Sequence, residues 1–347
     1  MTDPIFDTAF TRKLGVTIPI AQAPVGEAST PAMVAAVANA GGLGTLSITW
    51  RDPETLPALL REVRSLTGRP VAVNLVLHWD PEERLRIALA EGFRVVSFFW
   101  GDPAPWIEPV KAAGGIVMHT VGSAAEARRV VDAGVDVVVA QGWEAGGHVW
   151  GEVSTLALVP RVADAVAGDA VVLAAGGITD GRGLAAALAL GADGVWMGTR
   201  FLMAEEATTH PAWQDALVAA EETDTLHGVL FDGGWEDAPL RSLRNATVAA
   251  WEAAGRPPHG QRPGEGETIA TGEDGREISR YGSDGPILGA SGGVDQMCLY
   301  AGQGVGLLAR RQPAGEIVRE VATEAARVLR GLAGSGDAPS PGTTRRG

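Results

Sequence analysis

Residues 136–148 read DVVVAQGWEAGGH, and this stretch decides how the rest of the chain is interpreted. Residues 137–140 are an apolar run of the kind that forms a strand buried in a parallel sheet. A glycine-rich turn and His148 follow it directly. Parallel α/β folds bind ligands beyond the carboxyl ends of their strands, so we expect a binding site here. Glycine lets a large ligand approach the main chain, and histidine transfers protons near neutral pH.

The same alternation of a short apolar strand with an amphipathic helix extends to both sides of this stretch. The expected strands are residues 18–21, 44–48, 71–75, 95–98, 115–119, 137–140, 171–174 and 194–197. The expected helices are residues 31–40, 53–67, 81–91, 105–113, 124–133, 155–167 and 181–190, with residues 314–332 as the last one. Eight such units predict a (β/α)8 TIM barrel.

A doubly wound open sheet is the competing architecture, because counting strands does not exclude it. Its dinucleotide-binding fingerprint would follow the first strand as GxGxxG. Residues 22–26 read QAPVG instead. The sequence therefore favours the barrel.

After the eighth expected strand the alternation stops. Residues 213–251 have a helical pattern broken by Gly233-Gly234, and residues 255–293 are rich in glycine, proline and charge. Long irregular segments inside a domain are usually functional or mobile. We therefore expect an α/β protein of the following organisation: a barrel made of residues 1–211 and 291–333, a small inserted subdomain or lid of residues 212–290, and a disordered tail of residues 334–347.

Composition excludes several classes of function. The 347 residues are 46% hydrophobic and 20% charged, which suits one large core. The net charge of −14 opposes binding to nucleic acid. No apolar run is long enough for a membrane span, and the first 15 residues do not resemble a secretory signal, so we expect a cytoplasmic protein. The single cysteine, Cys298, is expected to be a buried structural thiol, and we expect no metal site. A homodimer is compatible with the sequence.

Two glycine-containing segments follow the seventh and eighth strands. They are Ala174-Ala175-Gly176-Gly177-Ile178 and Trp196-Met197-Gly198-Thr199-Arg200. In TIM barrels these two loops commonly form a phosphate site, because main-chain N–H groups converge on the anion. Each segment alone is equally well explained by an ordinary turn. Together they predict a phosphorylated cofactor.

Other positions predict a pocket for a ring. Asn74 is a polar amide inside an apolar strand and needs partners, either a ligand or a neighbouring strand. Ala23, Pro24 and Val25 follow the first strand, where a rigid turn is the alternative explanation. His119 ends the fifth expected strand and is a second, weaker histidine candidate. Four tryptophans at strand ends could form walls of the site: Trp100, Trp143, Trp150 and Trp196.

The chain resembles the nitronate monooxygenases, formerly called 2-nitropropane dioxygenases. The resemblance lies in residues 19–46 (PIAQAPVGEASTPAMVAAVANAGGLGTL), residues 140–148 (AQGWEAGGH) and residues 174–202 (AAGGITDGRGLAAALALGADGVWMGTRFL). It implies an oxidoreductase with FMN in a TIM barrel and His148 as the active-site histidine. The residues implied to contact the flavin are Ala23, Pro24, Val25, Asn74, Gln141, Gly146, Gly147, Gly176, Gly177, Trp196, Met197, Gly198 and Thr199. Residues 300–306 (YAGQGVG) look like the family's returning segment, which adds Tyr300 and Gln303.

The implied activity is the oxidation of alkyl nitronates by dioxygen to a carbonyl compound and nitrite. A protonated His148 would hold the anionic substrate, and a neutral one could remove the α-proton of a nitroalkane. The chain departs from the family pattern on the substrate side. Val25 stands where methionine is usual, Trp143 is unusually large, and the run after His148 is short. These departures leave the substrate open.

Two other functions stay open. Related flavoproteins use a nicotinamide nucleotide to reduce quinones or enoyl thioesters, and the enoyl reductases commonly have glutamate where this chain has Gln141. Gln141, together with Ala23-Pro24, favours the nitronate interpretation. The non-enzymatic alternative is a barrel that binds flavin as a sensor or scaffold.

Overall fold

Eight parallel strands form a barrel in the computed structural model, which describes residues 3–334. Their order around the barrel is β1-β9-β8-β6-β5-β4-β3-β2, and a parallel bridge between Ala21 and Leu43 joins the two end strands. This closure confirms the predicted TIM barrel and excludes the open sheet. The strands are β1 (Ile20–Gln22), β2 (Gly44–Ser47), β3 (Val71–Val76), β4 (Val95–Phe99), β5 (Ile116–Val121), β6 (Val137–Gln141), β8 (Val171–Ala175) and β9 (Gly194–Met197).

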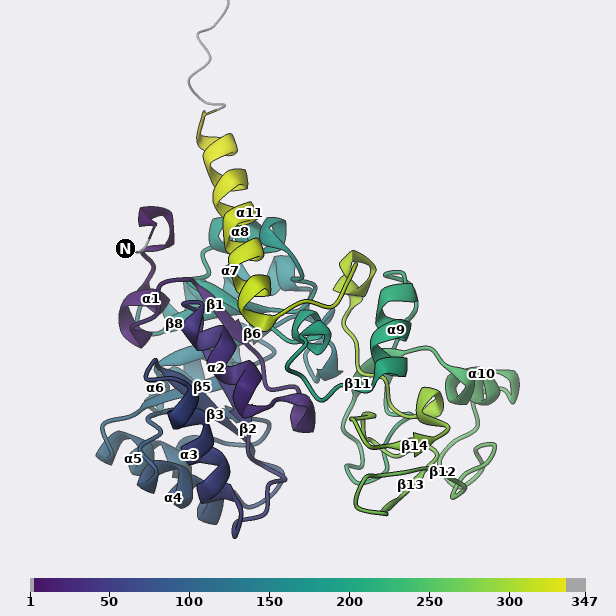
Figure 1. Ribbon diagram of the computed structural model, residues 1–347. Helices are drawn as coiled ribbons and strands as arrows, with labels where there is room; N and C mark the ends of the chain where they lie inside the picture. The colour runs from purple at the N-terminus through teal and green to yellow at the C-terminus, as the bar shows by residue number, and fades with distance from the viewer. Residues whose placement is uncertain (1–2, 335–347) are drawn as a thin grey trace, which may run out of the picture.

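Helices surround the barrel on its outside (Figure 1). Several begin at side-chain caps, as at Thr30, whose hydroxyl accepts from the N–H of Met33, and at Ser123 and Asp180. The long last helix packs against α8 and α2 and so completes the ring. The helices are α2 (Pro31–Asn39), α3 (Leu56–Leu66), α4 (Glu82–Ala90), α5 (Ala104–Ala112), α6 (Ala124–Asp132), α7 (Thr155–Val166), α8 (Gly181–Ala189) and α11 (Ala314–Gly334).

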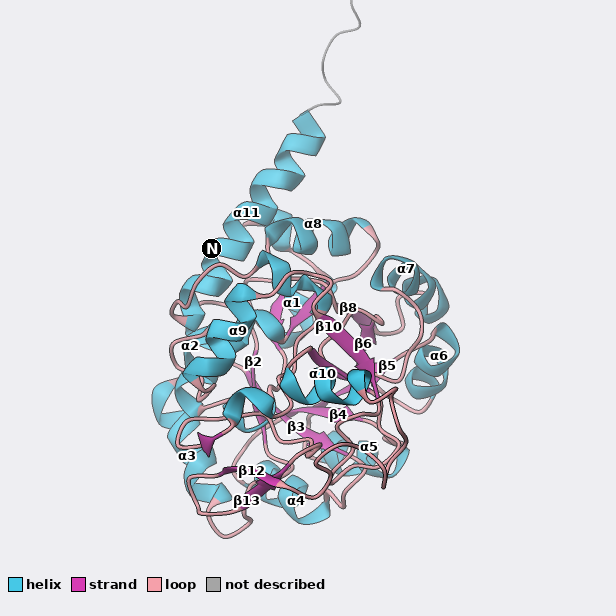
Figure 2. Ribbon diagram, turned by 90° about the vertical axis from the view of Figure 1, so that its right-hand side faces the viewer, coloured by secondary structure: helices cyan, strands magenta, loops and turns pink. Residues whose placement is uncertain are grey.

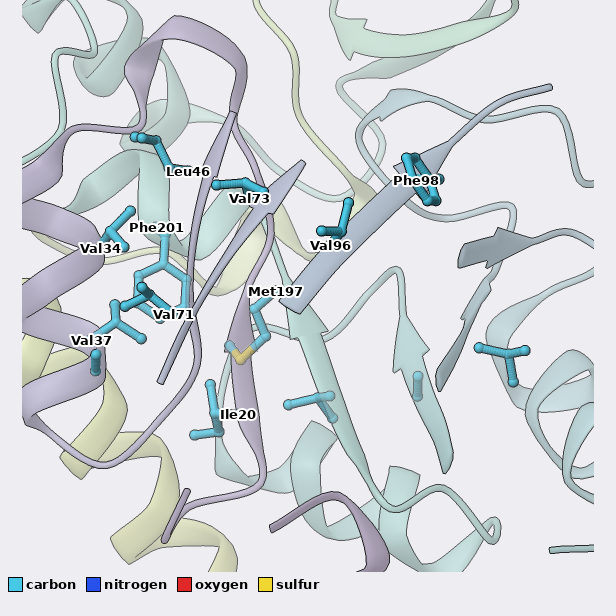
Figure 3. Packing of buried hydrophobic residues seen from close by; sticks show 14 of the residues in the cluster. Ile20, Val34, Val37, Leu46, Val71, Val73, Val96, Phe98, Met197 and Phe201 are labelled. Carbon is cyan, nitrogen blue, oxygen red and sulfur yellow. The ribbon is translucent and has the colours of Figure 1, made fainter. Parts of the chain in front are cut away.

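The hydrophobic core has two layers, because successive side chains of a strand point to opposite faces. Val71 and Val73 of β3 pack outward against the helices, with Met197 and Phe201, as Figure 3 shows. Ala72 of β3 points into the barrel. The short helix α1 (Ala9–Leu14), preceded by the 3-10 helix η1 (Pro4–Phe6), contributes Phe10 to this inner layer.

The chain between the barrel and α11 is not mainly helical, so the helical prediction for residues 213–251 is wrong in its middle. The two ends form α9 (Pro211–Ala219) and α10 (Ala246–Ala253), but β10 (Thr225–Gly228) and β11 (Leu240–Leu243) lie between them. β11 pairs with the short strand β7 (Gly147–His148), which follows β6. This pairing between distant segments overrides the local helical pattern, as tertiary contacts often do.

The glycine-rich part of this region also contains strands. β12 (Thr268–Thr271) pairs with β13 (Glu277–Ser279) and with β14 (Ser291–Gly292). Together with α9, α10 and the β10–β11 hairpin, these strands lie to one side of the barrel in Figure 1 and in front of it in Figure 2. We refer to residues 211–300 as the insert. The remaining 3-10 helices are η2 (Gly26–Ala28), η3 (Thr199–Met203), η4 (Val294–Gln296) and η5 (Gln303–Leu307).

Three other predictions concern the C-terminal tail, membrane-spanning helices and the single cysteine. The predicted tail, residues 334–347, lies outside the described residues except for Gly334. Among residues 3–334, no helix combines the length and the apolar character that crossing a membrane requires. Cys298 is a free thiol and is buried.

Candidate functional site

A cavity of about 950 Å³ opens at the carboxyl ends of the barrel strands, between the barrel and the insert. The alternation of side chains along the strands selects which residues line it, and Asn74, Gln141 and Trp196 point inward. Most residues implied to contact a flavin line this cavity. They are Ala23, Pro24, Val25, Asn74, Gln141, Gly146, Gly147, Gly176, Gly177, Trp196, Gly198, Thr199 and Tyr300, together with His148.

Two of the predicted contact residues are not part of the cavity lining. Met197 follows Trp196 in β9, so its side chain points away from the barrel axis and is buried in the outer core (Figure 3). Gln303 lies between Gly302 and Gly304, which do line the cavity, and its main-chain N–H donates to the carbonyl of Glu144 at 2.9 Å.

The glycine turn after β8 contributes to an open seat on one side of the cavity. Gly176 and Gly177 have φ values of +103° and +70°, which residues other than glycine rarely adopt. Among residues 3–334, no main-chain carbonyl accepts a hydrogen bond from the N–H of Gly177 or Ile178. A Cβ added to Gly198, after β9, would meet nothing nearer than 3.7 Å. We call Gly177, Ile178, Gly198 and Thr199 the glycine seat.

The returning segment holds the glycine-rich turn before His148 in place. The main chains of Gly146 and Gly302 approach so closely that a Cβ on Gly146 would lie 2.4 Å from the nitrogen of Gly302. The N–H of Gly302 donates to Oγ1 of Thr199 at 3.0 Å. Residues far apart in the sequence therefore meet beside the glycine seat, and only glycine permits this contact.

His148 is held by its main chain and is electrically neutral. It pairs with Leu240 of β11, and its carbonyl accepts a hydrogen bond from Nε2 of Gln141 at 3.1 Å. Its own Nε2 is buried and has no hydrogen-bond partner among the described residues. Burial, and to a smaller extent the neighbouring His78, lowers the pKa of His148 to about 3. The structure therefore presents a neutral imidazole that belongs to the cavity lining and has a buried nitrogen without a hydrogen-bond partner among the described residues.

The insert covers this imidazole with a residue that the sequence analysis did not single out. The ring of Trp235 lies 4.0 Å from that of His148, centroid to centroid, and is 4% exposed. Tyr300 lies on another side, 5.8 Å from His148, and its hydroxyl donates to the carbonyl of Ser283. The only local signal for Trp235 was its position after the glycine pair 233–234, in a region expected to act as a lid.

The second histidine candidate lies elsewhere. His119 lines a separate cavity of about 310 Å³ with Glu126 and Trp150. Its neighbour Met118 belongs to the inner core, so the alternation along β5 points His119 away from the barrel axis. Burial lowers the pKa of His119 to about 4. The prediction that this residue joins His148 at the site is therefore wrong.

Of the four tryptophans expected as walls, only Trp196 lines the main cavity. Trp100 lies behind the wall, with its ring 4.9 Å from Trp235 and 5.0 Å from Trp150. Trp143 instead packs under the buried guanidinium of Arg241, 4.1 Å from its ring centroid, and its carbonyl accepts from Nη2 of Arg241 at 2.9 Å. These three tryptophans therefore lie outside the lining of the main cavity.

The charged groups at the cavity are mainly acidic. Four carboxylates line it, those of Glu27, Glu273, Asp274 and Asp284. Arg276 is the one arginine or lysine of the lining, and both of its Nη atoms contact Asp284 at 3.1 Å. Within residues 3–334, no group of three or more His, Cys, Asp or Glu side chains is placed to hold a metal ion.

Comparisons with known proteins agree with this geometry. The family model described as nitronate monooxygenase matches residues 7–84 and 78–324. A nitronate monooxygenase of Pseudomonas aeruginosa is 35% identical over 91% of this chain and 98% of its own. A (3aS,4S,5R,7aS)-5-hydroxy-7a-methyl-1-oxo-octahydro-1H-indene-4-carboxyl-CoA dehydrogenase of Mycobacterium tuberculosis is 39% identical over 72% of this chain and 69% of its own. The solved structure of FabK from Thermotoga maritima is 30% identical with a TM-score of 0.77, and covers 94% of this chain and 99% of its own.

Proposed function

Because this chain belongs to the nitronate monooxygenase family and is a flavin-dependent oxidoreductase, we propose that it uses FMN to oxidise alkyl nitronates with dioxygen. In the balanced reaction, two nitronate anions and one dioxygen give two carbonyl compounds and two nitrite ions. Each carbon–nitrogen bond breaks, and the carbon gains one oxygen atom. The observation that carries the proposal is the neutral His148, which lines the cavity that also contains the glycine seat and whose buried Nε2 has no hydrogen-bond partner among the described residues.

The cavity has the features that FMN requires. Its volume of about 950 Å³ lies at the upper end of the range for ligand pockets. The free N–H groups of Gly177 and Ile178 offer donors to a phosphate, as glycine turns of TIM barrels commonly do. Gly198 and Thr199 face the same space across the seat. Bound FMN supplies the redox chemistry that connects the nitronate to dioxygen.

The neutrality of His148 favours a substrate that arrives already deprotonated. A general base works best when its pKa is near the operating pH, and a pKa of about 3 is far below it. A neutral imidazole can still donate a hydrogen bond from Nε2 to an oxygen of the nitronate. That bond uses the buried polar atom, which would otherwise remain unsatisfied. We therefore propose that His148 binds and orients the nitronate rather than removing a proton from a nitroalkane.

A second candidate is the reduction of enoyl thioesters or quinones with a nicotinamide nucleotide. The 39% identity to a carboxyl-CoA dehydrogenase favours it. The acidic cavity disfavours it, because four carboxylates face a single arginine that is already paired with Asp284. Nicotinamide nucleotides and CoA thioesters carry several phosphate charges, and like charges repel at such a site.

One experiment separates these functions. The purified holoprotein is mixed anaerobically with propyl-2-nitronate, or separately with NADPH or NADH, while its absorbance spectrum is recorded. We expect a yellow protein whose flavin is reduced by the nitronate and is reoxidised by air with release of nitrite. Reduction by a nucleotide and not by nitronate would replace the proposal with the reductase. A colourless protein that gains no thermal stability from added FMN would support the non-enzymatic alternative.

Separate experiments test the identity of the cofactor, the oligomeric state and the cellular location of the protein. Mass spectrometry of the chromophore released by heat distinguishes FMN from FAD. Size-exclusion chromatography with light scattering tests for a homodimer, and cell fractionation tests the proposed cytoplasmic location.

A further inference from the structure

We propose that the substrate half of this cavity selects nitronates that carry a flat, uncharged, ring-sized group. The inference rests on the proposed function, since it names the substrate class of the same site. The proposal rests on four aromatic side chains that line the cavity opposite the glycine seat. We call this set the aromatic wall: Trp50, Trp79, Phe99 and Trp235.

The aromatic wall and the glycine seat lie on opposite sides of the barrel mouth. The strand order places β8 across the ring from β3, and β9 across from β4. The seat follows β8 and β9, whereas Trp79 follows β3 and Phe99 ends β4. A cofactor whose phosphate occupies the seat therefore leaves the aromatic wall for the other ligand. His148 contacts Trp235 at one end of this wall.

Three rings of the wall, those of Trp50, Trp79 and Trp235, are held against one another by edge-to-face contacts, and the fourth, that of Phe99, packs against Trp100. The ring centroids of Trp50 and Trp79 are 5.4 Å apart at an interplanar angle of 72°, and those of Trp79 and Trp235 are 5.0 Å apart at 66°. Trp100 supports Trp235 from behind and has a φ of +63°, an unusual conformation for a bulky residue. Such strain is tolerated where the surroundings hold a side chain in a functional position. The wall is thus pre-formed.

Part of the wall remains uncovered by protein. Trp50 is 45% exposed although it lines a cavity, and Trp79 is only partly buried. Aromatic faces left open in a concave site favour a planar apolar ligand, because aromatic pairs gain from stacked and edge-to-face geometry beyond simple burial. A substrate as small as propyl-2-nitronate has no ring to place against these faces.

The negative charge of the cavity limits which charged groups the substrate can carry besides the nitronate. The carboxylates of Glu273 and Asp274, at the tip of the β12–β13 hairpin, line the same cavity, and the arginine of its lining, Arg276, is already paired with Asp284. A second negative group on the substrate would therefore be repelled. The preferred substrate has one anionic end, the nitronate, which His148 receives, and an uncharged planar end.

The test compares two dead-end ligands on the flavin-loaded protein. Nitrobenzene is planar, and 2-methyl-2-nitropropane is compact; neither carries a hydrogen on the carbon that bears the nitro group, so neither forms a nitronate. Their dissociation constants are measured from the change in flavin absorbance. We expect nitrobenzene to bind about tenfold more tightly, the effect of two aromatic contacts. We expect the ratio to fall below about threefold in Trp50→Ala and Trp79→Ala.

Trp106→Ala is the matched control, because Trp106 is a partly buried tryptophan of α5 that does not line the cavity. It should retain the wild-type ratio. A ratio that is the same in all three variants and the wild type overturns the inference, because hydrophobicity alone would then explain the preference. The same variants should lower the ratio of kcat/KM for phenylnitromethane nitronate over propyl-2-nitronate.

The binding and turnover results keep the two proposals distinguishable. Loss of the binding preference in the wall variants, in a protein that oxidises no nitronate, supports the wall and overturns the proposed function. If the protein oxidises nitronates but the wall variants leave the binding preference unchanged, the proposed function is supported and the aromatic wall is overturned.

Discussion

The indole of Trp235, from the insert, lies over the imidazole of His148, from the barrel, with their ring centroids 4.0 Å apart and their planes inclined by 33°. The pairing between β11 and β7 brings the insert to this point, because Leu240 lies opposite His148. The insert therefore does more than cover the barrel. It packs on the imidazole of His148, and burial is the largest cause of the lowered pKa of this histidine.

Replacing Trp235 should change the charge state of His148. Trp235→Ala admits water to the imidazole, so we expect the pKa of His148 to rise from about 3 toward its ordinary value of 6.5. Histidine NMR titration of the wild type and the variant measures the shift. Trp235→Phe keeps an apolar ring and should retain most of the lowering. A pKa that is unchanged in Trp235→Ala would show that the barrel alone desolvates His148.

His148→Asn should impair turnover without releasing the flavin. The amide retains a hydrogen-bond donor, but it is shorter and has no titratable group. We expect kcat/KM for nitronate to fall by about 10²-fold, the lower range for the loss of a positioned catalytic group. The ratio of flavin to protein, read from absorbance, should stay at the wild-type value. Wild-type turnover in this variant would remove His148 from the reaction.

The glycine seat can be tested with two matched substitutions. Gly177 and Gly168 both have positive φ, +70° and +87°, and neither is crowded at the Cβ position. Alanine therefore imposes a similar backbone strain of about 1 kcal/mol at each site. Gly168 is exposed in the loop after α7, and Gly177 lines the cavity.

We expect Gly177→Ala to weaken FMN binding at least tenfold, measured by fluorescence titration of the flavin-free protein. Gly168→Ala should lower the melting temperature by a similar amount but bind FMN as the wild type does. Equal FMN affinities in the two variants would place the phosphate elsewhere.

His119 should make the protein sensitive to acid. Its pKa is about 4 in the folded chain against 6.5 for the free group, so the unfolded chain takes up a proton first as the pH falls. Stability from this group is present above pH 6.5 and is lost progressively down to about pH 4. At pH 5 the loss is about 2 kcal/mol.

We therefore expect His119→Gln to lose less stability than the wild type when urea unfolding is compared at pH 7.5 and pH 5, both with saturating FMN. The comparison is made within each protein, which removes any effect of the substitution that does not depend on pH. Parallel losses in the two proteins would mean that His119 ionises normally in the folded state.

The strands of the barrel were predictable because each is a short apolar run bounded by turn residues. β9 was predicted at its observed bounds, and the other strands differ by one or two residues, at both ends in β1 and β5 and at one end in the rest. Adjacent side chains of a strand point to opposite faces, so the side chain of Met197 cannot line the cavity when that of Trp196 does. The same alternation turns His119 away while Met118 faces the barrel axis. The strand alternation, read from the sequence with the correct phase, therefore places the side chains of both residues away from the cavity.

The insert was predicted poorly for a different reason. β10, β11 and β7 are two to four residues long and have no strong strand pattern of their own. Short strands form where a partner supplies hydrogen bonds, and the partner of β11 lies far away in the chain. No local pattern encodes that partner.

The sequence by itself determined the barrel, the order of its elements and the glycine-rich turns at the carboxyl ends of the strands, since hydrophobic periodicity and glycine's backbone freedom act locally. Only the tertiary structure decided the state of the site. The neutrality of His148, its cover by Trp235 and the aromatic wall opposite the glycine seat depend on desolvation and packing between segments distant in the chain. Those effects belong to the surroundings of a side chain rather than to its neighbours in sequence.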